Sequence, residues 1–155
     1  EEVIETVSCI KVDEEFNYFG FCDDFGPMSL GSVCQFCRRV EEELNNNDTP
    51  VCITTARNVK SLTNAVFLLG SYMLMSLSFD VDAVRKLLEP ILRQAIPYTD
   101  VSPGKPTFGL KVEDCWGGLL KAKQLAWVSF AANGFDLEQY CHYDSPLNAD
   151  LHEVV

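Results

Sequence analysis

The segment 51–77 is the part of the chain whose residue types could arrange a chemical site. Val51 to Thr55 are mostly β-branched and predict a short buried strand, and the apolar residues 61–77 predict a helix. A loop between a strand and the start of a helix directs unpaired backbone N–H groups at one point, which suits a phosphate group. We therefore take as a candidate phosphate-binding loop the residues Thr54, Thr55, Ala56, Arg57, Asn58, Val59 and Lys60.

Phosphoryl chemistry in such a loop also needs a nucleophile. In cysteine-dependent phosphatases, loop N–H groups stabilise a thiolate at the start of the loop, and an arginine six residues later binds the phosphoryl oxygens. The residues six positions after the seven cysteines of this chain are Glu15, Met28, Val40, Glu43, Asn58, Lys121 and Leu147, and none is arginine. The candidate loop holds neither Cys nor Gly. We predict that the chain has no catalytic residue and is inactive by itself.

Other residue types with chemical potential have simpler explanations. The two basic residues of the loop could hold an anion, but long basic side chains are more often solvated. Cys34-x-x-Cys37 has no second such pair to complete the four ligands of a structural zinc site, so these cysteines are expected to fill the core of a helix. An odd number of scattered cysteines predicts free thiols. His142 is expected to be packed and hydrogen-bonded, and we expect no metal or cofactor.

The charge of the chain restricts its partners. Acidic residues outnumber basic ones by 23 to 12, and most of the excess lies in residues 1–50. Such a surface repels phosphate backbones, which argues against nucleic acid and anionic membranes and favours a basic peptide or protein. Carboxylates gather again near the C-terminus and could receive a Lys or Arg of a bound peptide, although a solvated helix face explains them equally well. They are Asp136, Glu138, Asp144 and Asp150.

The pattern of apolar and turn residues predicts one α/β domain over residues 1–155. The longest apolar stretch, Ala65 to Met75, is too short to span a bilayer, and no signal peptide is visible. The expected elements are a β-hairpin over 6–21, a helix from Leu30 to Leu44, a strand over 51–55, and helices over 61–77, 81–89, 113–128 and 135–143, with a loop over 96–109. Asp80 is the expected N-cap of the helix that Pro90 interrupts.

Three blocks of the chain resemble one family. They are Asp24-Phe25-Gly26-Pro27-Met28-Ser29-Leu30, the stretch Asn64-Ala65-Val66-Phe67-Leu68-Leu69-Gly70-Ser71-Tyr72, and Phe135-Asp136 with Tyr140-x-His142-Tyr143. In order and spacing they are similar to the N-terminal domain of the mitotic-exit dual-specificity protein phosphatases, the cell-division-cycle "fourteen" family. The resemblance covers roughly residues 9–155.

The resemblance implies a phosphatase-like sheet flanked by helices, with a degenerate phosphate loop. It also implies a second, catalytic domain in cis that carries the Cys-x5-Arg loop, with residues 145–155 running into the linker toward it. Substrates would be phosphoserine-proline proteins with a nearby basic residue, received by an acidic groove to which Asp144, Glu138 and Asp150 contribute. The chain departs from the family's acidic pattern at Gln139, Cys141, Ser145 and Leu147.

Two further expectations come from the same resemblance. The protein would be intracellular, in the nucleus and cytoplasm, with the centrosome or spindle as further sites. The alternative function is a stand-alone pseudophosphatase that acts as a protein-interaction module without a catalytic partner domain.

Overall fold

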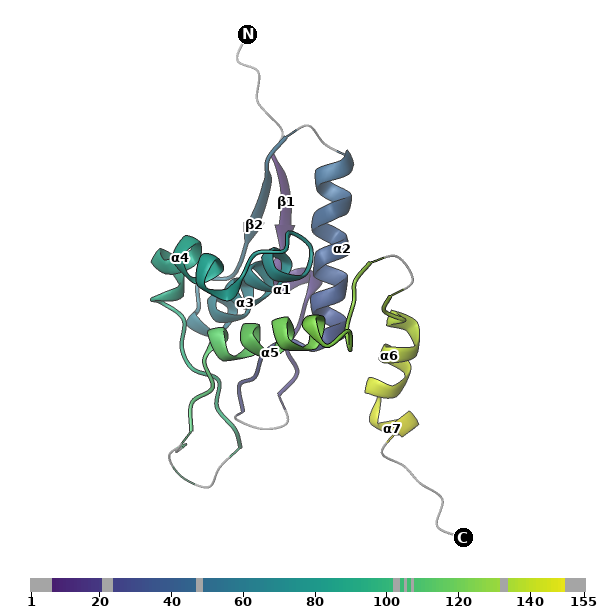
Figure 1. Cartoon of the computed structure of the whole chain (residues 1–155). Coiled ribbons are helices and arrows are strands. Elements are labelled where there is room, and N and C mark those ends of the chain that lie inside the picture. The colour runs from purple at the N-terminus through teal and green to yellow at the C-terminus, as the bar shows by residue number, and fades with distance from the viewer. Residues whose placement is uncertain are drawn as a thin grey trace.

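The fold is a small parallel sheet placed beside a set of helices (Figure 1). The computed structural model describes residues 7–20, 24–46, 49–101, 104, 106, 108–131 and 134–149. Its elements are β1 (Ser8–Lys11), α1 (Val12–Glu15), α2 (Leu30–Asn46), β2 (Val51–Thr54), α3 (Val59–Met75), α4 (Val81–Leu92), α5 (Val112–Gln124), α6 (Leu137–Asp144) and α7 (Pro146–Ala149). The predicted mixed α/β class is confirmed.

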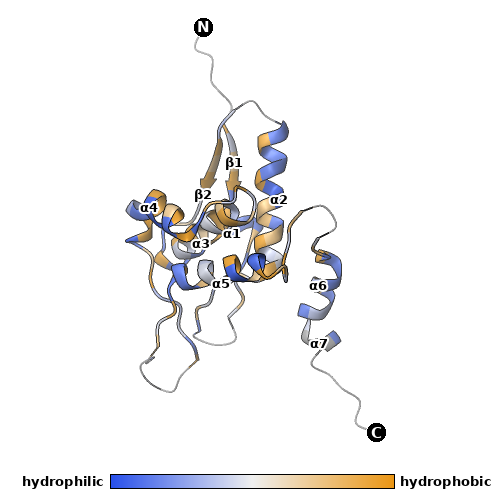
Figure 2. Ribbon diagram, in the orientation of Figure 1, coloured by the Kyte–Doolittle hydropathy of each residue, from blue (hydrophilic) through white to orange (hydrophobic). Residues whose placement is uncertain are grey.

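The two strands run parallel, with Cys9 opposite Cys52 and Ile10 opposite Ile53. The isoleucines turn toward the core, while the cysteines are exposed on the other face of the sheet. The predicted strand over 51–55 is therefore half-buried rather than buried. Figure 2 shows mostly hydrophobic colours along the two strands and mostly hydrophilic colours at the C-terminal end of α2.

The predicted hairpin over 6–21 is wrong. The residues expected to form its turn make the helical turn α1, and β1 pairs with β2 instead of with a strand formed by 16–21. Val12 and Phe16 are four residues apart, so one helical turn places both side chains on the same side. Both are buried, and the ring of Phe16 packs edge-on against Phe36 at 5.6 Å between centroids.

Helix α3 lies at the centre of the core and contacts α2, α4 and α5. Its apolar residues face neighbours on several sides, which explains why the sequence is hydrophobic almost throughout. Trp116 of α5 is fully buried against it and donates its indole N–H to the carbonyl oxygen of Phe67 at 3.0 Å. Within the described residues, none of the helices is long and apolar enough to cross a membrane.

Two predicted helix ends need correction. Asp80 caps α4 as expected, with Oδ1 accepting from the N–H of Ala83 at 2.7 Å, but the helix continues through Pro90 to Leu92. Proline removes one helical hydrogen bond, and here the carbonyl left without that bond belongs to Lys86, an exposed residue that solvent can reach. Helix α5 ends at Gln124, short of the predicted 128, and Ala126 takes a left-handed conformation with φ of 56°.

Candidate functional site

The loop between β2 and α3 has the strand–loop–helix arrangement expected from the sequence. Asn58 is the N-cap of α3, and its side-chain oxygen accepts from the N–H of Ser61 at 2.8 Å. The N–H of Asn58 in turn donates to the carbonyl oxygen of Ala56 at 2.8 Å. These bonds hold the loop in a tight turn at the start of the helix. The helix was predicted over residues 61–77, whereas α3 begins at Val59 and ends at Met75.

A carboxylate from another part of the chain occupies this turn. Oδ2 of Asp13 accepts a hydrogen bond from the hydroxyl of Thr55 at 2.9 Å and another from the N–H of Ala56. Burial raises the pKa of Asp13, but hydrogen bonds from the Ser61 side chain, from Ala56 and from Thr55 outweigh it and hold the pKa below the ordinary value of 3.8. The donors of the candidate phosphate loop are thus already matched to an anion of the chain itself.

Sequence reasoning missed Asp13 because its partners lie more than 40 residues away. No pattern within a short stretch of the sequence predicts such a contact. The sheet register explains it: Lys11 lies opposite Thr54, so the two strands end side by side at the same edge. Asp13 lies two residues after the last residue of β1, and Ala56 lies two residues after the last residue of β2.

The two basic residues of the loop do not gather around an anion position. Arg57 and Lys60 are both exposed. The ammonium of Lys60 lies 5.4 Å from the ring centroid of Phe25, an arrangement in which the aromatic face attracts the cation. In the described part of the chain, neither residue forms an ion pair with a carboxylate. The solvated alternative explains them better than an anion clamp.

A hollow of about 320 Å³ adjoins the loop. Its polar lining includes the carboxylates of Asp13 and Asp24, the ammonium of Lys60 and the buried amide of Asn64. The hydroxyl of Tyr18 donates to Asp24 at 2.5 Å, and burial together with this hydrogen bond raises the pKa of Tyr18 to about 12. With two carboxylates against one ammonium, the hollow disfavours a phosphate dianion.

The predicted groove carboxylates do not lie together. Asp144 lines a hollow of about 630 Å³ with Phe19, Gln35 and Ser32. Glu138 lines a different hollow, of about 360 Å³, on the same helix. Six positions along an α-helix separate two side chains by about 120° around its axis, so these two carboxylates face different directions. Asp150 lies outside the described residues.

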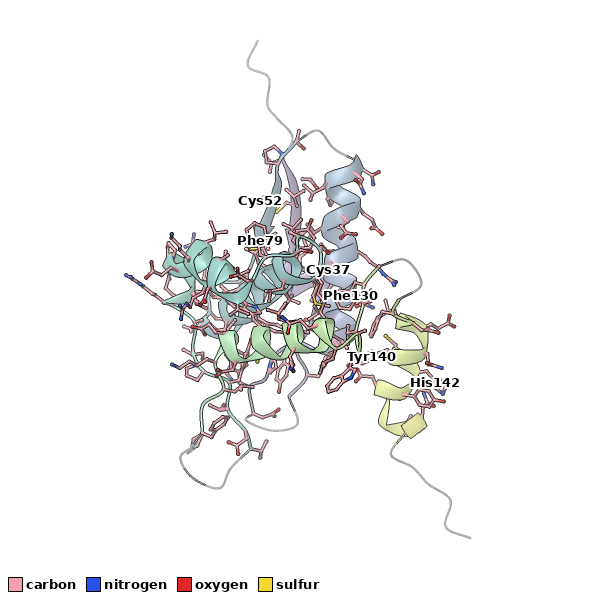
Figure 3. All side chains as sticks on the ribbon, in the orientation of Figure 1. Cys37, Cys52, Phe79, Phe130, Tyr140 and His142 are labelled. Atoms are coloured by element: carbon pink, nitrogen blue, oxygen red, sulfur yellow. The ribbon has the colours of Figure 1, made fainter. Side chains whose placement is uncertain are left out.

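Helix α6 is held against the start of α2 by aromatic packing. A Cβ atom on Gly31 would lie 2.9 Å from the ring of Tyr140, so the glycine allows the ring to approach the helix backbone closely. The ring of Phe135 packs on Tyr140 at 5.4 Å and on Phe130 at 5.5 Å between centroids. Figure 3 shows Tyr140 on the side of α6 that faces α2. This contact determines where Asp144 lies relative to α2.

His142 lies on the opposite side of α6 from Tyr140 (Figure 3). Its ring is exposed, so the prediction of a packed histidine is wrong. The expected polar contact is present: the amide nitrogen of Asn148 lies 3.5 Å from Nδ1 of His142. An exposed histidine on a helix surface does not have the environment of an activated base.

The cysteines behave as the sequence predicts. Cys34 and Cys37 are buried, and the six cysteines that the structure describes are free thiols. Burial raises the pKa of Cys37 to about 12, which leaves its thiol protonated and unreactive at neutral pH. Cys37 therefore belongs to the hydrophobic core, and Cys34 is buried beside it on α2.

The class of protein follows from a comparison with known families. A family model described as the N-terminal half of dual specificity protein phosphatases matches residues 1–122. The chain belongs to this family, and the family predicted from the three sequence blocks is confirmed.

The relatives refine this placement. Human dual specificity protein phosphatase CDC14C is 29% identical over 152 residues, which cover 96% of this chain and 34% of that protein. Mouse dual specificity protein phosphatase CDC14A is 32% identical over 149 residues, 94% of this chain and 24% of that protein. Caenorhabditis elegans tyrosine-protein phosphatase cdc-14 is 26% identical over 164 residues, 100% of this chain and 23% of that protein. The chain thus spans about a third of the length of these relatives or less.

Proposed function

We propose that this chain is the non-catalytic N-terminal domain of a dual-specificity protein phosphatase. The observation that supports this best is the state of the candidate loop, which lacks a cysteine nucleophile and an arginine six residues later and is occupied by the Asp13 carboxylate. The match to the N-terminal half of the family supports a Cys-x5-Arg domain in cis. The parallel β1–β2 pair beside α3 would then be part of a phosphatase-like sheet.

The domain's role in this proposal is to shape a substrate groove. The hollow beside α6 combines the Asp144 carboxylate with the side chain of Phe19, which is 88% exposed. A carboxylate beside an apolar surface suits a basic residue of an extended peptide. The substrates would be phosphoserine-proline proteins with such a residue nearby. Glu138 points elsewhere, so we assign the main contribution to Asp144.

The cellular setting is part of the same proposal. The family resemblance supports it: the protein would act inside the cell, in the nucleus and cytoplasm, in a mitotic role. The segment 145–155 would lead toward the catalytic domain. Residues 146–149 form α7, and 150–155 lie outside the described residues, so the linker stays a prediction.

A direct test uses p-nitrophenyl phosphate. The 155-residue chain should not hydrolyse it, because the loop offers no thiolate and no clamp for the phosphoryl group. Turnover by the purified chain that disappears in Arg57→Ala would refute the non-catalytic assignment.

The groove is tested in the chain joined to the Cys-x5-Arg domain that the proposal requires. Asp144→Asn should reduce the preference in kcat/KM for phosphoserine-proline peptides with a following Lys over neutral ones by about fivefold, because an exposed ion pair is worth up to about 1 kcal/mol. Glu138→Gln removes the same charge from the other face of α6 and should leave the preference unchanged. Equal preference in the parent and in Asp144→Asn would remove the groove assignment.

A further inference from the structure

The contact between Asp13 and the loop joins two segments that are distant in sequence. Because Lys11 and Thr54 are opposite each other in the parallel sheet, the chain leaves both strands at the same edge. One strand continues into α1, which carries the carboxylate, and the other continues into the turn before α3, which carries the donors. The hydroxyl of Thr55 and the N–H of Ala56 both donate to the same oxygen, Oδ2 of Asp13.

These donors have the character of an oxyanion site. A backbone N–H and a hydroxyl group that converge on one oxygen are favourable partners for negative charge, and they lie in the turn just before Asn58, the N-cap of the 17-residue helix α3. The Ser61 side chain lies close enough to lower the pKa of the same carboxylate. A carboxylate that accepts several such bonds replaces part of the coordination that a phosphate group would receive in an open loop.

We propose that the loop between β2 and α3 is an anion site whose occupant is the chain's own Asp13 carboxylate. While Asp13 is in place, its charge repels a phosphate dianion and its oxygen takes the donors that the dianion would need. When the carboxylate is removed, Thr55 and Ala56 lose their acceptor, and the hollow of about 320 Å³ that Asp13 and Ser61 line gains room for a tetrahedral oxyanion. A carboxylate of the same chain therefore prevents free phosphate from binding to the candidate phosphate-binding loop.

This inference does not depend on the substrate groove, because Asp144 lines a different hollow from the one that Asp13 lines. It also differs from a purely structural explanation. If Asp13 only fastened α1 to the loop, its removal would lower stability, and water would replace it whatever anion is dissolved. An anion site predicts that inorganic phosphate binds in place of the carboxylate.

The test follows the backbone amide signals of Ala56 and Ser61 in ¹⁵N-labelled 155-residue chain during titration with inorganic phosphate, with sodium chloride at matched ionic strength as the control salt. The parent chain should show no saturable shift of these signals. Asp13→Ala should show saturable shifts, with an affinity at least about tenfold above any binding by the parent. Asp82→Ala, which removes an exposed carboxylate from α4, should behave as the parent does.

A second variant covers the case in which Asp13→Ala fails to fold. Asp13→Asn keeps an oxygen that accepts from Thr55 and Ala56 but removes the charge, so it should bind phosphate more weakly than Asp13→Ala and more tightly than the parent. The proposal is overturned if the folded variants show no phosphate-specific shift. It is overturned equally if the parent chain binds phosphate at Ala56 as tightly as the variants do.

Discussion

The substitution Gly70→Ala tests how α3 and α5 pack together. A Cβ atom on Gly70 would lie 2.1 Å from Cζ2 and 2.3 Å from Cε2 of Trp116, far inside contact distance. The indole ring is fully buried and is held by its hydrogen bond to Phe67, so it cannot move aside without losing that bond. The two helices must separate or the ring must leave its position.

The size of the effect follows from three opposing contributions. Alanine is more favourable than glycine inside a helix by about 1 kcal/mol. Overpacking a dense core costs about 1–3 kcal/mol, and loss of the Trp116 hydrogen bond costs about 0.5–1.5 kcal/mol. We therefore expect Gly70→Ala to lower the free energy of unfolding by about 1–3 kcal/mol, in spite of its better helix propensity.

The assay is urea denaturation followed by far-UV circular dichroism, with Gly118→Ala as the matched control. Gly118 lies in α5, and a Cβ atom there would meet no atom within 4 Å. Gly118→Ala should raise the free energy of unfolding by up to about 1 kcal/mol, because only helix propensity changes. If Gly70→Ala is as stable as the parent while Gly118→Ala behaves as expected, the close approach of Trp116 to α3 is refuted.

Three further predictions concern α6, the loop and the cysteines. Gly31→Ala should push the ring of Tyr140 away and speed amide hydrogen exchange in α6 without changing the global circular dichroism; unchanged exchange would contradict the docking contact. The pKa of Asp13 is lower in the folded chain than its ordinary 3.8, so its charge stabilises the fold above that pH, and the stabilisation is lost as the pH falls through the folded-state pKa. Urea titrations at several pH values should therefore show the gap between the parent and Asp13→Asn at neutral pH closing in acid; a gap independent of pH would refute this. Iodoacetamide at pH 8 should modify the exposed Cys52 and spare Cys37, which is buried and whose pKa is about 12; mass spectrometry of labelled peptides checks this, and equal labelling would show that the core is open.

Local sequence signals predicted the helices well. The apolar spacing from Leu30 onward and the cap residue Asp80 depend on neighbours within a few positions, and α2 and α4 form there. The prediction of a hairpin over 6–21 was wrong because the pattern of apolar and turn residues in this short segment fits more than one structure. The acidic residues 13–15 fit a turn between strands, but the burial of Val12 and Phe16 in the core favours a helical turn.

The candidate site likewise contains residues that the sequence identified and residues that only the tertiary structure identified. Asn58 was already visible as a residue of a strand–helix loop, and the structure makes it the cap of α3. Asp13 could not be assigned, because nothing in a short window links it to Thr55. The acids of the last segment looked equivalent in the sequence, whereas helix geometry separates Glu138 from Asp144.

The amino-acid sequence by itself determined that the loop cannot perform cysteine-dependent phosphoryl chemistry, because a missing nucleophile and a missing arginine are facts of composition and spacing that no fold can change. It also determined the longer helices α2 to α6, whose hydrogen bonds run between residues four positions apart, but not the short helix α1. Only the tertiary structure decided what occupies the loop and which carboxylates share a hollow. Those outcomes depend on the parallel pairing of strands more than 40 residues apart and on the packing of α6 against the start of α2, and neither is encoded in any short stretch of the chain.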